Sequence, residues 1–303
     1  MSNILVTGGT GFLGRHLVRR LLADNNTVHI CNTTTCNLHN YDELCTTFKG
    51  ERFDYIFHLA AKTKAGDYCI YHKGEQWIDN QLLNTNILKF WVNEQPGARL
   101  IGMGTSCMYE PSDEHLKEEM CMTGDTEAGL YAYAHTKRML LVGLQSIAEQ
   151  YDLKYTYFIP STLYGTDFVL HDNHFIFDLI KKIYNGKHNN DDVVLWGNGH
   201  QRRELIYIDD VIDIMMLLLD SDNQVINLGT GHDNSIREFA ATVSKFIDFD
   251  PSRIIYDESR YTGAQVKTLS PSKLISLMPD NFLFTSLDDG IKSTIEYYLS
   301  ARK

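Results

Sequence analysis

The chain alternates short apolar runs with longer segments in which apolar residues recur every three or four positions. Five early apolar runs have the length of buried strands: 3–7, 27–31, 54–59, 99–103 and 154–159. The segments between them have the spacing of amphipathic helices: 11–23, 41–48, 75–94 and 130–150. Strands that alternate with helices of this length predict a parallel sheet with helices on both faces.

The pattern loosens over segment 161–203, which is rich in Gly, His and Asn and shows few clear strands. Further elements follow it: a strand and helix at 205–219, a strand at 225–228 and a helix at 236–247. Asp209 or Asp210 is placed to cap the first of these helices. Ser235 and Glu238 form a capping box before the second.

These elements indicate an α/β fold: a Rossmann-type doubly wound parallel sheet with a smaller α+β substrate-binding lobe. We expect a dinucleotide-binding domain formed by residues 1–160 plus about 204–230. The lobe is expected to comprise residues 161–203 plus about 231–303. Because the carboxyl ends of parallel strands share one edge of a sheet, we expect the ligand cleft at that edge, between the two parts.

Composition and charge exclude several classes of protein. With 43% apolar and 22% charged residues, the composition is that of a globular protein with a core. The net charge of −11 argues against a general nucleic-acid-binding protein, which carries a basic patch. No apolar run approaches the length of a membrane span, and the six cysteines include no C-x-x-C pair. We therefore expect a cytoplasmic protein with reduced thiols and no nucleic-acid or membrane partner.

A glycine-rich loop, GGTGFLG at residues 8–14, joins the first strand to the first helix. Glycines permit a tight turn and a close approach of the backbone to a diphosphate, which the free N–H groups of a helix N-terminus attract. A lone G-x-G-x-x-G is common, but its place between a strand and an amphipathic helix makes it specific. We predict a dinucleotide site whose diphosphate is surrounded by Gly8, Gly11, Phe12, Leu13 and Gly14.

The residues after the second strand bear on the choice of dinucleotide. NAD-binding sites usually place a carboxylate there, which binds the ribose 2′-hydroxyl. Here Asn32 and three threonines follow the strand, so no acid repels a 2′-phosphate. Asn32 is the candidate for the ribose contact, and Arg15, just inside the first helix, is either a phosphate contact or a solvated surface residue. The pattern favours NADP and leaves NAD open.

Tyr133 and Lys137 lie four residues apart in the predicted helix 130–150, so both side chains are on one face. Because a nearby ammonium stabilises tyrosinate, we expect Tyr133 to have a lowered pKa and to transfer a proton to or from a carbonyl or alcohol. The pair alone is common by chance. Thr105 strengthens the prediction, because it follows the strand at 99–103 and is expected at the same edge of the sheet.

The order of the motifs resembles one known family. The motifs are TGGTGFLG (7–14), HLAAKT (58–63), NQLLNTN (80–86), GTSCMYE (104–110), YAHTK (133–137), STLYG (161–165), WGNGHQRRELIYIDD (196–210) and INLGTG (226–231). Through them nearly the whole chain is similar to the extended short-chain dehydrogenase/reductases, the NAD-dependent epimerase/dehydratase family. The resemblance implies that Thr105 binds the sugar oxygen and that Tyr133 transfers the proton. It also implies that Lys137 binds the nicotinamide ribose and tunes Tyr133, and that Ala60 lines the cofactor site.

Within that family the sequence resembles most the GDP-L-fucose synthase branch, which epimerises a 4-keto sugar at C3 and C5 and then reduces C4. The resemblance places the cysteine of that branch at Cys107, its histidine at His174 and its diphosphate-binding arginine at Arg203. A C4 ketone acidifies the protons at C3 and C5. A cysteine thiol, partly ionised near neutrality, can remove such a proton, and a histidine can return one on the opposite face.

Further candidates for the substrate site are Thr162, Lys182 and Trp196. Thr162 stands where the family often has asparagine, and Lys182 stands where this branch tends to have arginine. Trp196 fits either the core or a pocket for the base. An H-x-x-H pair that ends at His174 lacks a third ligand, so we expect no metal.

We therefore expect NADPH-dependent reduction of the C4 ketone of a GDP-4-keto-6-deoxy sugar, hexose or heptose, with C3/C5 epimerisation. Two alternatives stay open: C4 reduction alone, on a GDP- or CDP-sugar, and a non-catalytic dinucleotide-binding protein. The intact Thr105, Tyr133 and Lys137 disfavour the second alternative. The resemblance also implies a homodimer formed through the helices near 75–94 and 130–150.

Overall fold

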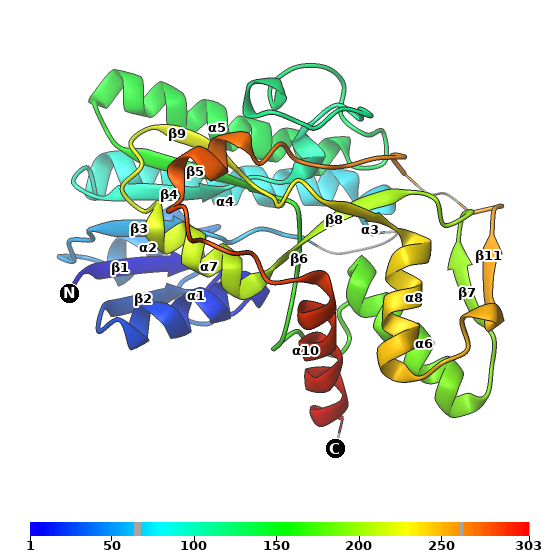
Figure 1. The fold of residues 1–303 in the computed structure, drawn as a ribbon. Helices are drawn as coiled ribbons and strands as arrows, with labels where there is room; N and C mark the ends of the chain where they lie inside the picture. Colours follow the sequence, from blue (N-terminus) through cyan, green and yellow to red (C-terminus); the bar gives the residue numbers. More distant parts are fainter. Residues whose placement is uncertain (64–67, 261–262, 303) are drawn as a thin grey trace.

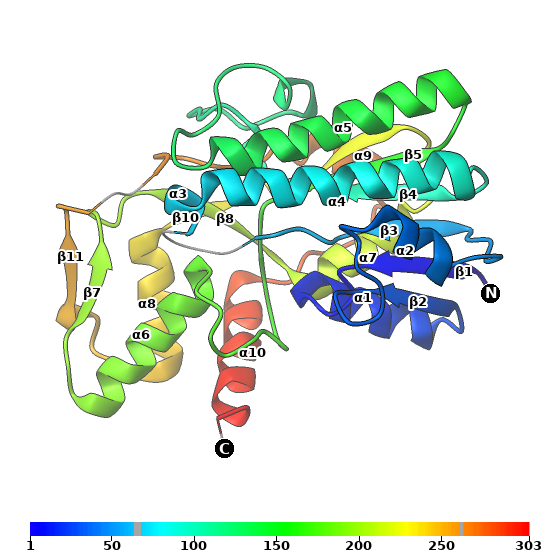
Figure 2. The same ribbon diagram turned by 180° about the vertical axis from the view of Figure 1, so that it is seen from behind.

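Residues 1–63, 68–260 and 263–302 are described by the structure, a computed structural model. Its centre is a six-stranded sheet in the order β2-β1-β3-β4-β5-β9, in which all neighbours are parallel (Figures 1 and 2). The strands are β1 (Asn3–Thr7), β2 (Thr27–Cys31), β3 (Tyr55–His58), β4 (Arg99–Met103), β5 (Tyr155–Pro160) and β9 (Gln224–Leu228). The predicted parallel sheet is confirmed, and each strand begins and ends within one residue of its predicted position.

Helices cover both faces of this sheet. On one face α4 (Lys73–Glu94) packs against α5 (Tyr131–Tyr151), and on the other α1 (Phe12–Ala23) packs against α7 (Ile208–Leu217) (Figure 1). The shorter helices α2 (Tyr41–Thr47) and α3 (Tyr68–Tyr71) adjoin α4. Because side chains alternate along a strand, Leu5 joins the core under α4 and α5, while Ile4 and Val6 join the core under α1 and α7.

The strand order places a topological switch beside β1. The chain runs from β1 outward to β2 and then returns to β3 on the opposite side of β1. In such sheets the ligand crevice opens at the carboxyl ends of the two strands that flank the switch. The glycine loop follows β1 and the Leu59-Ala60 segment follows β3, so both border this crevice.

The remaining elements build two small sheets and a second group of helices. The small sheets are β10 (Asp233–Ser235), β8 (Arg202–Tyr207) and β6 (Thr162–Tyr164), and β11 (Ile254–Asp257) with β7 (Val193–Trp196). The helices are α6 (Phe175–Asn189), α8 (Ile236–Ile247), α9 (Ser272–Leu277) and α10 (Leu287–Ser300), with 3-10 helices at Ser106–Met108, Glu118–Met120 and Pro251–Arg253. Helices α6, α8 and α10 enclose a separate apolar core that contains Ile180, Phe239 and Ile295.

Two local expectations are settled by the structure. The capping box of Ser235 and Glu238 is confirmed at the start of α8. Capping of α7 by Asp209 or Asp210 is wrong, because the helix begins earlier, at Ile208, and both residues fall in its first turn. The Asp210 carboxylate instead accepts two hydrogen bonds from Thr285, one from its N–H and one from its hydroxyl, each at 2.8 Å.

The segment 161–203 is more regular than its composition indicated. It contains β6, the whole of α6, β7 and the first residues of β8. Helix α6 has no side-chain cap at its start, which removes the signal that sequence analysis uses for a helix N-terminus. The division of the chain into a dinucleotide-binding domain and a lobe stays a prediction. In the part of the chain that is described, no helix is long and apolar enough to cross a membrane.

Candidate active site

The glycine loop folds so tightly that two of its glycines cannot carry a side chain. Gly8 has a φ of +70°, and a Cβ there would lie 2.7 Å from the Ala60 backbone nitrogen. A Cβ on Gly14 would clash with the Gly8 carbonyl oxygen. Gly11 caps α1 without any side-chain hydrogen bond, so the first N–H groups of the helix have no side-chain partner. This loop fits a dinucleotide diphosphate.

The side chains of the next two residues pack into the protein. The Phe12 ring lies edge-on to the Phe177 ring, with ring centres 5.5 Å apart, and so joins α1 to α6. Leu13 packs against the core under α1 and α7. At Phe12 and Leu13 the group available to a diphosphate is therefore the backbone N–H and not the side chain.

The candidate ribose and phosphate contacts already have partners within the chain. The Asn32 carboxamide oxygen accepts a hydrogen bond from the Thr34 N–H at 2.9 Å. The Arg15 guanidinium donates to the Asp167 carbonyl, and its Nε lies 3.5 Å from the Asp167 carboxylate. Partial burial opposes ionisation of Asp167, but Arg19 and Arg15 hold its pKa below the usual range. A 2′-phosphate at Arg15 would therefore compete with Asp167.

Buried hydrogen bonds connect the carboxyl ends of β1 and β3 to α5. The Thr7 hydroxyl oxygen lies 2.9 Å from His58 Nδ1. His58 Nε2 lies 3.0 Å from the Asn84 carboxamide oxygen, and Asn84 donates to the Thr136 carbonyl at 3.0 Å. Burial, together with the charge of Lys137, lowers the pKa of His58 to about 3, so its ring is neutral. The motif HLAAKT begins with this histidine but gives no sign of its buried contacts.

Thr105, Cys107 and Tyr133 lie together where β4 ends. Thr105 caps the 3-10 helix Ser106–Met108 by accepting a hydrogen bond from the Cys107 N–H at 3.3 Å. The Thr105 hydroxyl also hydrogen-bonds to Tyr133. Lys137 follows one turn later on α5 and is only 3% exposed. The structure thus brings these four predicted residues to the carboxyl edge of the sheet.

Burial sets the ionisation of this group. It raises the pKa of Tyr133 above its usual value, and Cys107 and Cys69 add to the rise, while the Thr105 hydrogen bond opposes it. Burial also lowers the pKa of Lys137 to about 8. The expected lowering of the Tyr133 pKa is therefore wrong for the chain alone, because the loss of hydration outweighs the attraction of an ammonium. Tyr133 holds its proton at neutral pH, which is the form that donates.

His174 pairs with a residue outside that group. It is the residue before α6, and its Nδ1 lies 2.5 Å from the Asp172 carboxylate, which also accepts the His174 N–H at 2.8 Å. The side chain is 45% exposed. Within the described residues, no hydrogen bond or ion pair joins His174 to Cys107 or Tyr133.

Two of the candidate substrate residues, Lys182 and Trp196, are neighbours. The Lys182 ammonium pairs with Asp178 at 3.0 Å and lies 5.9 Å from the centre of the Trp196 ring. The Arg260 guanidinium lies 5.7 Å from the same ring. Since Trp196 is 46% exposed, its ring belongs to the surface and not to the core.

The other two candidates, Arg203 and Thr162, belong to the sheet of β10, β8 and β6. Arg203 donates from Nη1 to the Ala264 carbonyl at 2.8 Å. The residue before Ala264, Gly263, lies close to both Arg203 and Glu127. A Cβ on Gly263 would lie 2.8 Å from a Glu127 carboxylate oxygen and 3.6 Å from Arg203 Nη2. Thr162 is partly buried in β6. Arg203 therefore faces the same side of the site as Glu127.

The sequence model of the NAD dependent epimerase/dehydratase family matches residues 4–229. The chain belongs to this family. A GDP-L-fucose synthase of Dictyostelium discoideum is 26% identical over 306 residues, which cover 98% of this chain and 95% of that one.

Solved structures of the epimerase/dehydratase fold align over almost the whole chain. A GDP-L-fucose synthetase from Naegleria fowleri bound to NADP has a TM-score of 0.86 at 25% identity, over 99% of this chain and 94% of that one. A GDP-mannoheptose C4 reductase from Campylobacter jejuni with NADP bound has a TM-score of 0.86 at 26% identity, over 98% of each chain.

Lys267 is a neighbour of Cys107 that the sequence did not indicate. Lys267 places its Nζ 3.7 Å from the Cys107 Sγ and 3.3 Å from a Glu127 carboxylate oxygen. It lies 160 positions beyond Cys107, in a segment without helical or strand periodicity, and no motif includes it. Only the folded chain brings the two side chains together.

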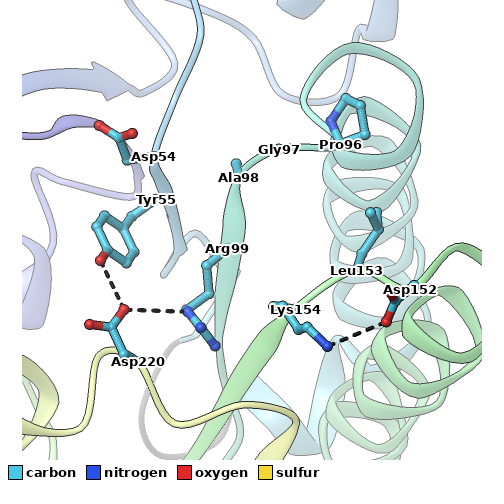
Figure 3. Close-up of a pocket in the computed structure, with 10 residues that line it drawn as sticks. All are labelled: Asp54, Tyr55, Pro96, Gly97, Ala98, Arg99, Asp152, Leu153, Lys154 and Asp220. Carbon is cyan, nitrogen blue, oxygen red and sulfur yellow. Dashed lines mark hydrogen bonds and ion pairs between the residues drawn. The ribbon is translucent and has the colours of Figure 1, made fainter.

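Shallow hollows elsewhere on the surface do not belong to the family's candidate site. One lies at the amino ends of β3 and β4, where Asp54, Tyr55 and Arg99 contribute to its lining (Figure 3). There Asp220 accepts a hydrogen bond from the Tyr55 hydroxyl at 2.9 Å and lies 3.7 Å from Arg99 Nε. This edge of the sheet is opposite to the one where ligands bind. Among the described residues, no three His, Cys, Asp or Glu side chains gather as a metal site.

Proposed function

We propose that the protein uses NADPH to reduce the C4 ketone of a GDP-4-keto-6-deoxy sugar, hexose or heptose, and that it first epimerises C3 and C5. The observation that carries this proposal is that Thr105, Cys107 and Tyr133 lie together at the carboxyl edge of the sheet, the edge that also carries the glycine loop. The relatives support the substrate class and the cofactor: they are GDP-L-fucose synthases and a GDP-mannoheptose C4 reductase, two of them with NADP bound.

The chain offers a contact for each part of NADP. The glycine loop would hold the diphosphate against the N-terminus of α1. Asn32 would contact the adenosine ribose, and Arg15 would exchange Asp167 for the 2′-phosphate. Ala60 follows β3 and would line the crevice, and Lys137 would bind the nicotinamide ribose. When bound, NADPH supplies the hydride for C4.

Reduction also needs a proton on the C4 oxygen, and Tyr133 supplies it. The tyrosine keeps its proton because burial raises its pKa, and Thr105 orients the hydroxyl through a hydrogen bond. As hydride reaches C4, the Tyr133 proton moves to the oxygen and the carbonyl becomes an alcohol. Lys137 is largely buried, and its pKa is lowered to about 8. It then stabilises the tyrosinate that remains and helps solvent to return a proton to Tyr133.

Epimerisation uses a base on one face of the sugar and an acid on the other. The Cys107 thiolate takes the proton from C3 or C5, and the electrons of the broken C–H bond pass into the C4 carbonyl as an enolate. His174 returns a proton to the same carbon from the opposite face. Asp172 holds the His174 ring through Nδ1, which leaves Nε2 for this transfer.

The nucleotide contacts come from the predicted lobe of residues 161–203 and about 231–303. Arg203 and Lys182 balance the diphosphate charge in a chain whose net charge is −11. The exposed Trp196 ring, with Lys182 nearby, offers a stacking surface for the base. Thr162 in β6 contacts the sugar.

A C4 reductase without epimerase activity is the second candidate function. It is favoured by the pairing of His174 Nδ1 with Asp172, which already engages this exposed side chain. In that case the substrate is a GDP- or CDP-4-keto sugar that already has its final configuration at C3 and C5.

We also propose a homodimer formed through α4 and α5. Helix α4 exposes Trp77, Ile78 and Leu82, and its neighbour α5 exposes Met139 and Val142. A face of this composition is typical of a subunit interface. Light scattering at micromolar concentration measures the mass directly, and a monomer would contradict the proposal.

Replacement of Tyr133 by Phe tests the proposed chemistry. The hydroxyl that protonates the C4 oxygen is removed, so turnover of NADPH with GDP-4-keto-6-deoxymannose should fall by about 10²–10⁴-fold. NADPH binding, measured by fluorescence titration, should stay within about twofold because the tyrosine hydroxyl does not hold the dinucleotide. Undiminished turnover in Tyr133→Phe would refute the proposed role.

A further inference from the structure

Lys267 enters the active site from the C-terminal part of the chain. Its ammonium lies 3.7 Å from the Cys107 Sγ and 3.3 Å from a Glu127 carboxylate oxygen. The Lys267 side chain is 15% exposed and that of Glu127 is 12% exposed. Solvent therefore screens this contact much less than it screens an ordinary surface ion pair.

The backbone next to Lys267 is fixed on two sides. Leu116, which lies in the loop after the active-site 3-10 helix, exchanges backbone hydrogen bonds of 2.9 and 2.8 Å with segment 268–270. The buried Glu204 carboxylate accepts the Leu269 N–H at 2.8 Å. The backbone that follows Lys267 is therefore held by hydrogen bonds and keeps the root of its side chain near Cys107.

We propose that Lys267 is a positioning residue that keeps Cys107 in its thiolate form for removal of the proton from C3 or C5. This inference rests on the proposed epimerase function. A cation close to a thiol favours the thiolate, and an ammonium can also donate a hydrogen bond to the sulfur. Glu127 pairs with the Lys267 ammonium at 3.3 Å and so helps to hold it beside the sulfur.

The proton balance closes through exchange with solvent. The thiolate accepts the proton from carbon and becomes a neutral thiol, while the negative charge moves to the C4 oxygen of the enolate. His174 gives a proton to the carbon and the ketone forms again; the thiol then loses its proton to solvent, and His174 takes one up from solvent. Lys267 neither gains nor loses a proton during the cycle, so it acts on the rate of proton removal and not on the hydride step.

Alkylation of Cys107 by iodoacetamide as a function of pH tests this role without any sugar. The modified peptide, identified by mass spectrometry, separates Cys107 from the other thiols. In Lys267→Met we expect alkylation at pH 7 to slow about tenfold and the pH profile to move upward by about one unit. Lys267→Arg keeps a positive charge at this position and should restore most of the wild-type rate.

Lys273→Met is the matched control. Lys273 lies six positions later in the same part of the chain and donates to the Val225 carbonyl at 2.7 Å, so its loss removes a charge and a hydrogen bond away from Cys107. Its alkylation profile should superimpose on that of the wild type. If Lys267 had only a structural role, its replacement would change the stability of the protein but not the pH dependence of Cys107 alkylation.

The same variants separate this inference from the proposed function. Lys267→Met should slow deuterium exchange at C3 and C5 about tenfold, while reduction of an already epimerised substrate stays within about threefold of the wild-type rate. An unchanged alkylation profile in Lys267→Met, or in Lys267→Gln if the first variant does not fold, overturns the inference. A shifted profile together with a wild-type product that carries no label supports the contact and contradicts epimerisation instead.

Discussion

At the scale of single residues, the loss of hydration decides which side chains around the sheet edge carry charge. It raises the pKa of Tyr133, lowers that of Lys137 to about 8 and lowers that of His58 to about 3. The site of the chain alone therefore contains a protonated tyrosine and a neutral histidine. This state is suited to reduction, because Tyr133 already carries, before hydride transfer, the proton that it gives to the C4 oxygen.

The depressed pKa of His58 predicts how stability depends on pH. Since the unfolded chain binds a proton at His58 near pH 6.5 and the folded chain only near pH 3, the contribution of His58 is present above pH 6.5 and is lost as the pH falls toward 3. Between pH 7 and pH 5 this loss is about 2 kcal/mol. Urea unfolding should show a smaller loss over this range in His58→Gln.

The exposed His200 provides the control for that measurement. His200→Gln should keep the pH dependence of the wild type, because this residue lies on an open loop. If His58→Gln and the wild type lose the same free energy of unfolding between pH 7 and pH 5, the neutral state assigned to His58 is incorrect.

Single residues were predictable where local spacing determines their position. Tyr133 and Lys137 are one helical turn apart, and Thr105 directly follows a strand, so short sequence patterns place them. Lys267 and His58 acquire their importance from contacts with distant parts of the chain, which no local pattern encodes. The sign of the Tyr133 pKa shift was missed because burial of a hydroxyl depends on packing.

At the scale of elements, the join between β1 and α1 depends on close backbone contacts. Gly8 approaches the Ala60 backbone, and Gly14 approaches the Gly8 carbonyl oxygen. These contacts bring the start of α1 down onto the ends of β1 and β3. The helix N-terminus is thereby placed at the topological switch, where a diphosphate can reach it.

Gly14→Ala tests this packing. The added methyl group meets backbone atoms that cannot move aside, so we expect a loss of about 1–3 kcal/mol in the free energy of unfolding and weakened NADPH binding. Gly74→Ala is the matched control, because a Cβ in that part of α4 meets nothing within 4 Å and the change favours the helix by up to about 1 kcal/mol. Equal stability and NADPH affinity in Gly14→Ala and the wild type would contradict the tight loop.

Elements of the parallel sheet were predictable because buried strands and amphipathic helices leave strong periodic patterns. Helix α6 was not, although its buried residues Ile176, Ile180 and Ile183 follow helical spacing. It lacks a side-chain cap, and the polar residues before it resemble a loop. Strands β7 and β11 pair, among the described residues, only with each other and are four residues long, too short for a clear pattern.

At the scale of the whole molecule, the C-terminal part of the chain completes a site that the central sheet begins. The sheet carries the glycine loop, Thr105 and Cys107 at one edge, and the segment around Lys267 returns across that edge. Leu116 and the Glu204 carboxylate hold this segment through hydrogen bonds to its backbone. The contact between Lys267 and Cys107 therefore joins parts of the chain that are 160 positions apart, which no local sequence pattern encodes.

The most direct test of the central claim is a single reaction in heavy water. Purified protein, NADPH and GDP-4-keto-6-deoxymannose are mixed, oxidation of NADPH is followed by absorbance, and deuterium in the product is located by NMR. The proposed function predicts that NADPH is oxidised and that the product carries deuterium at both C3 and C5. Oxidation without deuterium at either carbon would contradict epimerisation and leave a C4 reductase. Absence of oxidation with this sugar and with heptose and CDP-linked 4-keto substrates would contradict the reductase as well.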